Sequence, residues 1–459
     1  MTPASPQPVL GVRHAIAIVV GIVIGAGIFK APSLVAQMTG SPGWMFAAWA
    51  LGGLASLAGA LCYAELATTY PHAGGDYHFL WRAYGRRVSF LFAWARFAVI
   101  TTGSIALLAF VFGDYMTQLL PLGAWSESLY AAAAIVVLGW VNLRGMRSGA
   151  LAQSWLTIVE VLGLLLAVVA GLYLLVQGAG ATGAAVGADA SGAAGAAPGW
   201  GMFGLAMVFV LLTYGGWNEA AYLGAELRDV SRNMLRVLVA SIAIITALYL
   251  MVNAAYWYGL GIDGMAKSNA VAADLLRVSF GRTGEILVSA VVAVSALTSI
   301  NATMIVGARS SFAVGNDWPA LAGLGRWHAT RGTPTNALLA QTLFALALVA
   351  LGSNARGGFE TMVEYTAPVF WTFFLLSTLA LIVLRRRDPH AVRPFRVPLY
   401  PLLPLVFAAV CAYMLWSSLV YVRLGAIVGV AVLAAGVLAM LALEVHGARL
   451  RAAQAGRPG

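Results

Sequence analysis

The sequence contains few charged residues. Asp, Glu, Lys and Arg make up 10% of its 459 residues, whereas a soluble domain carries about 25%. The mean hydropathy is +0.85, and apolar runs of about 20 residues, long enough to cross a bilayer, recur along the chain. These features exclude a soluble α/β enzyme and predict a membrane protein with many spans.

Motifs for several other chemistries are also missing. The two cysteines, Cys62 and Cys411, lie in apolar runs, so they predict buried thiols and neither a disulfide framework nor a metal site. No histidine stands in an HExxH or other paired-ligand spacing, so we expect no metal and no cofactor. The sequence has no phosphate-binding loop of an ATPase and no hydrolase elbow, and we expect no enzyme. The N-terminus lacks signal-peptide features, so we expect the first apolar run to stay as a span.

The apolar runs predict a single all-α integral membrane domain, 1–459, with twelve transmembrane helices. These are expected at about 14–36, 44–68, 88–118, 129–143, 151–177, 201–225, 235–260, 284–314, 335–352, 359–384, 398–421 and 424–445. The Gly/Ala-rich segment 178–199 predicts a flexible extracellular loop, and 446–459 a short cytoplasmic tail.

The basic residues are distributed unevenly between the loops. With the N-terminus inside, twenty of the 27 lysines and arginines lie on the cytoplasmic side and five on the outer side. This bias predicts a multi-pass protein of the plasma (inner) membrane with both termini in the cytoplasm. It also explains the net charge of +10 without a nucleic-acid partner.

Glycines interrupt two of the predicted spans. The first span contains Gly25-Ala26-Gly27, and the sixth contains Gly215-Gly216 followed by Asn218 and Glu219. Irregular backbone at membrane depth is tolerated where it lines a cavity, although such glycines can also serve close helix packing. Because the interruptions lie five spans apart, they predict inverted repeats at 13–177 and 200–384, with spans 11 and 12 (385–445) outside the repeats.

The interruptions have complementary polarity. Free N–H groups at Gly25, Ala26 and Gly27 suit a carboxylate, and free carbonyls near Thr213 to Gly216 suit an ammonium. A ligand that carries both groups on adjacent atoms, an α-amino acid, would bridge the two helices. Its side chain would meet Tyr214, Trp217 or Asn218, and ordinary packing is the alternative for the two aromatic residues.

Several segments resemble a known family. These are GIVIGAGIFKAPS (21–33), GALCYAELATTYPHAGGDY (59–77), TYGGWNEAAYLGAEL (213–227), SINATMIVGARSSFAVGNDW (299–318) and RPFRVP (393–398). Together they resemble the amino acid–polyamine–organocation transporters, above all the L-type amino acid transporter branch and its bacterial relatives. The resemblance implies the LeuT-like five-plus-five inverted repeat with broken helices 1 and 6, and amino acid transport by alternating access.

The resemblance also implies roles for individual residues. It assigns the substrate carboxylate to the backbone of Ile24, Gly25, Ala26 and Gly27. It assigns the amine to the carbonyls of Leu212, Thr213 and Gly215, with Asn218 lining the site. Leu212 stands where the L-type branch has an aromatic gate, which puts occlusion by this residue in doubt.

Animal L-type transporters are linked by a disulfide to an ancillary glycoprotein through a cysteine between spans 3 and 4. The corresponding loop here, PLGAWSES (121–128), has no cysteine. We therefore expect a chain that works without such a subunit.

Ionisable residues inside the predicted spans are Lys30, Arg96, Glu160 and Glu219. Glu160 stands where many sodium-independent relatives have a lysine, and Thr298-Ser299 resembles the hydroxyl pair of sodium-coupled cousins. One hypothesis is an H+ or Na+ coupling site formed by these oxygens with carbonyls near Gly21 and Ile24. The alternative is that Lys30 or Arg96 neutralises Glu160 while both hydroxyls bond to their own helix.

The sequence leaves the role of Glu219, the transport mode and the substrate class open. Glu219 either meets a cationic substrate side chain or pairs with Lys30. The transport mode is either ion-coupled uptake or exchange, and the substrate is either an amino acid or a polyamine or organic cation. A non-transporting amino acid sensor is a further interpretation.

Overall fold

The computed structural model describes residues 11–72, 75–144, 149–180, 197–220, 227–318, 321–326, 328, 333–354, 357–420 and 424–455. Within these residues the chain is helical, and the one β-type contact is an isolated bridge between His328 and Thr333. The all-α prediction is therefore confirmed for the part of the chain that the structure describes.

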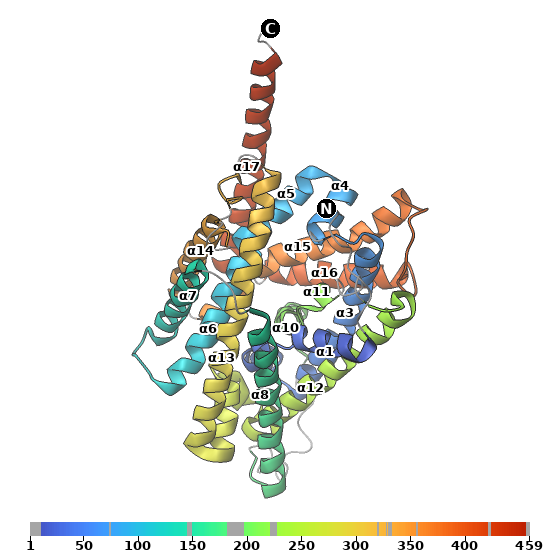
Figure 1. The fold of residues 1–459 in the computed structure, drawn as a ribbon. Coiled ribbons are helices and arrows are strands. Elements are labelled where there is room, and N and C mark those ends of the chain that lie inside the picture. Colours follow the sequence, from blue (N-terminus) through green and yellow to red (C-terminus); the bar gives the residue numbers. More distant parts are fainter. Residues whose placement is uncertain are drawn as a thin grey trace.

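Long helices form the body of the structure (Figure 1). They are α3 (Pro42–Thr69), α7 (Ser126–Arg144), α8 (Gly149–Gln177), α12 (Val230–Lys267), α13 (Val271–Asp317), α14 (Thr335–Ser353), α15 (Gly358–Arg387), α16 (Leu402–Val420) and α17 (Leu424–Ala455). A further continuous stretch consists of α5 (Arg86–Ala95), the π-helix η2 (Arg96–Thr101) and α6 (Thr102–Leu119). The shorter helices are α1 (Val12–Val23), the 3-10 helix η1 (Ala26–Phe29), α2 (Ala31–Thr39), α4 (Asp76–Tyr84), α10 (Trp200–Thr213) and α11 (Trp217–Ala220).

Nine helices within the described residues are long and apolar enough to cross a membrane. They coincide with nine of the predicted spans. The predicted spans 14–36, 201–225 and 424–445 overlap the shorter apolar helices Val12–Val23, Trp200–Thr213 and Ala426–Ala442. Two of these three are the spans in which glycines interrupt the helix.

Some elements differ from the sequence-based expectation. The loop expected between spans 2 and 3 contains α4, and α17 continues through the expected tail to Ala455, where it extends beyond the other helices (Figure 1). Backbone of non-helical conformation at Gly261 and Gly281 divides α12 and α13, so helical segments also occupy the expected loop between spans 7 and 8. The central part of the predicted loop 178–199, residues 181–196, lies outside the described residues.

Small residues allow the helices to approach closely. A Cβ added at Gly53 of α3 would lie 2.2 Å from Thr246 of α12, and one at Gly171 of α8 would lie 2.4 Å from Ala255 of α12. In lipid the hydrophobic effect gives no driving force for helices to associate. Dispersion contacts at such close approaches are therefore a main source of helix association. These contacts hold α12 between α3 and α8.

A buried carboxylate joins α3 to the connection between α15 and α16. Glu65 accepts hydrogen bonds from Arg385 Nε at 2.6 Å, from Arg385 Nη2 and from the Val397 N–H at 2.6 Å. Arg393 Nε lies 3.5 Å from Glu65 Oε1. Because Glu65 is only 1% exposed, its charge depends on these partners rather than on water.

We predict that Glu65→Gln destabilises the protein by about 3 kcal/mol, because breaking a buried ion pair leaves its partner uncompensated. The melting temperature of the detergent-purified protein measures this effect. Arg232→Gln is the matched control, since Arg232 is exposed and has no ion pair among the described residues. Equal melting temperatures for the two variants would contradict the assigned role of Glu65.

Candidate functional site

The first interruption separates α1 from η1. Helix α1 ends at Val23, and the next two residues have extended backbone, Ile24 at φ −69° and ψ 121° and Gly25 at φ −149° and ψ −178°. Helical structure resumes at Ala26, so the leading N–H groups there lack intrahelical partners. A Cβ added at Gly25 would meet no atom within 4 Å. The backbone at Gly25 therefore borders open space that a ligand group can enter.

The second interruption separates α10 from α11. Helix α10 ends at Thr213, the Gly215 N–H donates to the Leu212 carbonyl at 3.0 Å, and Gly216 adopts a φ of 103°. A side chain at Gly216 would be strained at this φ. It would also place a Cβ 2.8 Å from the Ile22 carbonyl oxygen. Glycine at position 216 thus permits both the turn and the close contact with α1.

The two interruptions lie against each other. Besides the contact between Gly216 and Ile22, a Cβ added at Gly27 would lie 3.4 Å from Thr213 Oγ1. The N–H groups of one helix start and the carbonyls of one helix end therefore border the same region. This juxtaposition is the arrangement that can bind a ligand carrying both a negative and a positive group.

Tyr249 of α12 bridges the interruptions. Its hydroxyl lies 3.3 Å from the Val23 carbonyl oxygen and 3.2 Å from the Thr213 carbonyl oxygen. A single hydroxyl hydrogen can be donated to only one of them at a time. Sequence reasoning missed Tyr249, because the span 235–260 also contains Tyr256 and Tyr258 and no pattern in the sequence distinguishes one of the three.

The aromatic side chains beside the second interruption are packed into the bundle. Tyr214 is fully buried and donates to the Trp49 carbonyl at 3.0 Å. Trp217 packs edge-on against Tyr63 and Phe374, with ring centroids 5.4 Å apart in both pairs. Ordinary packing therefore accounts for the contacts of both aromatic residues.

Leu212 and Asn218 are half-buried. The amide of Asn218 has no hydrogen-bond partner among the described residues, so it is available to a ligand. Glu219 belongs to α11, and its side chain lies outside the described residues.

Glu160 of α8 faces two serines of α13. Ser295 donates a short hydrogen bond to Glu160 Oε1, and the Ser299 hydroxyl lies 3.4 Å from the same oxygen. The Thr298 hydroxyl donates instead to the Val294 carbonyl of its own helix at 2.9 Å. The structure therefore brings Ser299 to Glu160 but leaves Thr298 apart. Ser295 was not predicted, although its place one turn before Ser299 puts both on one face of the helix.

Lys30 has a different partner from those expected from the sequence. Its ammonium lies 2.8 Å from Asp114 Oδ2 of α6 and donates to the Asn269 carbonyl at 3.0 Å. The hypothesis in which Lys30 neutralises Glu160 is therefore wrong, because the ammonium is engaged by Asp114. Asp114, near the end of α6, was not among the expected intramembrane charges.

Two further predicted residues lie apart from these contacts. Gly21 lies within α1, two residues before that helix ends. Arg96 is half-buried at the start of the π-helix η2 and has no ion pair among the described residues, so the hypothesis in which it neutralises Glu160 is not supported. The π-helix itself was not predicted, and its Ala98 carbonyl accepts a hydrogen bond from the Tyr365 hydroxyl at 2.6 Å.

A family model described as an amino acid permease matches residues 10–442. The chain belongs to this amino acid permease family. It is 30% identical over 426 residues to the human b(0,+)-type amino acid transporter 1, covering 91% of this chain and 83% of the relative. It is 31% identical over 422 residues to the mouse large neutral amino acids transporter small subunit 2, covering 91% and 78%. It is 27% identical over 417 residues to the serine/threonine exchanger SteT of Bacillus subtilis (strain 168), covering 90% and 91%.

We predict that Tyr249→Phe loosens the contact between the interruptions, because it removes the donor shared by Val23 and Thr213 while keeping the ring. Hydrogen–deuterium exchange should rise in peptides covering residues 20–30 and 209–218, and stability should fall by about 1 kcal/mol. The control is Tyr256→Phe two turns along the same helix, since the buried Tyr256 hydroxyl has no partner among the described residues. Wild-type exchange in Tyr249→Phe would contradict the bridge.

Proposed function

We propose that this permease is a secondary active transporter that moves an α-amino acid across the membrane by alternating access. The observation that carries the proposal is the contact between the two interrupted helices at Gly216 and Ile22 and at Gly27 and Thr213. The N–H groups at Gly25, Ala26 and Gly27 would bind the carboxylate, which a helix start favours. Ile24 would border the site through its extended backbone only, because its N–H donates to the Val20 carbonyl at 3.0 Å.

The carbonyls of Leu212, Thr213 and Gly215 would bind the ammonium. The Leu212 carbonyl already accepts the Gly215 N–H, and the Thr213 carbonyl lies within reach of the Tyr249 hydroxyl. A carbonyl oxygen has two lone pairs, so the Thr213 carbonyl can accept a further hydrogen bond. The half-buried Asn218 amide would then contact the substrate side chain.

The relatives support an amino acid as the substrate. Their names describe a b(0,+)-type amino acid transporter, a large neutral amino acids transporter and a serine/threonine exchanger. The last of these favours exchange as the alternative to ion-coupled uptake. Polyamine or organic cation transport is the second candidate substrate class, because Glu160 and Glu219 add acceptors for cationic groups.

The membrane topology is part of the proposal. We infer twelve spans, with a LeuT-like five-plus-five inverted repeat at 13–177 and 200–384. The matching interruptions of the first and sixth spans support this repeat. The distribution of arginines supports a location in the plasma (inner) membrane with both termini in the cytoplasm.

The chain is proposed to work without a disulfide-linked ancillary subunit. Its sequence has two cysteines, Cys62 and Cys411, and both are free and buried in the helix bundle. Neither thiol is placed to form a bond with another chain. The loop 121–128 offers no third cysteine.

Glu160 is proposed as the residue that couples transport to an H+ or Na+ gradient. Its carboxylate contacts the Ser295 and Ser299 hydroxyls, and oxygen atoms of this kind are suitable ligands for a hard cation. A buried carboxylate that lacks a basic partner can also carry a proton. Thr298, included in the sequence-based hypothesis, is left out because its hydroxyl bonds to its own helix.

Purified protein in liposomes tests the main proposal. Vesicles loaded with an unlabelled amino acid should accumulate labelled amino acids of a panel by counterflow, and putrescine should not compete. The same vesicles under imposed proton or sodium gradients distinguish coupled uptake from exchange. Counterflow of amines alone, or no counterflow at all, would contradict amino acid transport.

We predict that Glu160→Gln abolishes the response to the coupling-ion gradient while counterflow persists, because the amide keeps the volume but can neither ionise nor release a proton. Thr298→Val is the matched control on the facing helix and should respond like the wild type. The measurement is initial uptake with and without the gradient. Full gradient dependence in Glu160→Gln would remove Glu160 from the coupling site.

A further inference from the structure

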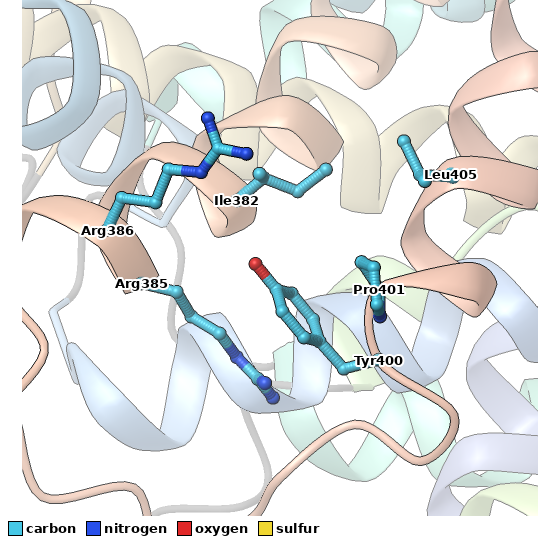
Figure 2. Close-up of a pocket in the computed structure, with 6 residues that line it drawn as sticks. All are labelled: Ile382, Arg385, Arg386, Tyr400, Pro401 and Leu405. Atoms are coloured by element: carbon cyan, nitrogen blue, oxygen red, sulfur yellow. The ribbon is translucent and has the colours of Figure 1, made fainter.

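A pocket outside the candidate substrate site lies where α15 ends and α16 begins. Its volume is about 490 Å³, and its lining residues are Ile382, Arg385, Arg386, Tyr400, Pro401 and Leu405. Figure 2 shows the Tyr400 ring between the Arg385 side chain on one side and Ile382 with Arg386 on the other. Pro401 and Leu405 lie across the pocket from the arginines (Figure 2).

The two arginines of the pocket have different partners. Arg385 forms the ion pair with Glu65, and its guanidinium stacks on the Tyr400 ring, 3.8 Å from the ring centroid. Arg386 is exposed, and its guanidinium has no hydrogen bond or ion pair among the described residues. The pocket therefore contains one arginine that holds the tyrosine ring and one cation that is free to bind an anion.

The Tyr400 hydroxyl adds a second donor. It has no hydrogen-bond partner in the described part of the chain, and it points in the direction of Ile382, on the same side of the ring as Arg386 (Figure 2). A guanidinium and a phenol hydroxyl together suit a phosphate group, which accepts charge-assisted hydrogen bonds. The surrounding segment 385–396 contains five arginines and one aspartate, so an anion is also favoured at longer range.

Apolar surface continues from the pocket along α16. Leu405 lines the pocket and is 50% exposed, and Leu402 and Val406 beside it are 60% and 46% exposed. In a membrane helix, exposed side chains of this type contact acyl chains. A ligand that fits both surfaces has an anionic head and apolar tails.

We propose that this pocket binds the headgroup of an anionic phospholipid, with the phosphate at Arg386 and Tyr400 and the acyl chains along Leu402 and Leu405. The proposal rests on the orientation in the proposed function, which places this end of α15 at the cytoplasmic leaflet, where basic segments meet anionic lipids. Because Arg385 joins the pocket to Glu65 of α3, a bound lipid would brace three helices at this end of the bundle.

Native mass spectrometry of the detergent-purified full chain tests the site with phosphatidylglycerol and phosphatidylcholine as probes. Phosphatidylglycerol should bind at lower concentration. Arg386→Gln should weaken its binding about fivefold, the contribution of one arginine at a membrane surface, and Tyr400→Phe should also weaken it. Arg386→Lys should bind nearly as the wild type does. Arg232→Gln is the control, since Arg232 is likewise exposed and without an ion pair among the described residues.

Three outcomes would overturn the proposal. They are equal binding of the two lipids, an Arg386→Gln variant that binds like Arg232→Gln, and displacement of the lipid by an equal concentration of inorganic phosphate. The last would identify a site for small anions. The measurement involves no transport, so a chain that binds phosphatidylglycerol but moves no amino acid would contradict the proposed function and leave the lipid site standing.

Discussion

A backbone N–H or carbonyl group left without a partner in the hydrocarbon core costs several kcal/mol. Continuous helices avoid this cost. In this chain two helical segments are interrupted, between α1 and η1 and between α10 and α11. The two interruptions lie against each other, since a Cβ added at Gly216 would lie 2.8 Å from the Ile22 carbonyl oxygen. The Tyr249 hydroxyl can donate its hydrogen to either the Val23 or the Thr213 carbonyl at these interruptions. The remaining N–H and carbonyl capacity is what a zwitterionic substrate can satisfy.

The buried carboxylates show how differently this helix bundle compensates charge. Glu65 is held by two arginines and a backbone N–H, and Asp114 by a lysine. These pairs join segments distant in the sequence, and their charges are balanced. Glu160 contacts two serine hydroxyls instead and meets no basic side chain among the described residues. Its charge is therefore free to depend on a bound cation or proton, which is why the coupling proposal rests on it rather than on the other two.

The sequence alone predicted the features that depend on local chemistry. Long apolar runs predicted the spanning helices, and Gly25, Gly27, Gly215 and Gly216 predicted where two of them stop, because glycine weakens a helix wherever it stands. The partners across the bundle could not be predicted. Tyr249, Asp114 and Ser295 gain their roles only when distant helices pack. The helix α4 was missed for another reason, since its nine residues are too few and too polar to resemble a span.

The central claim is that the two interruptions bind the carboxylate and the ammonium of one ligand. Competition binding to the purified protein tests it most directly, with a labelled amino acid found by counterflow and its methyl ester and N-acetyl derivative as competitors. We predict that blocking either group weakens competition by at least about tenfold, because each removes a charge-assisted hydrogen-bonding group worth about 1.5–3 kcal/mol. Competition by both derivatives as strong as that of the parent amino acid would contradict the account.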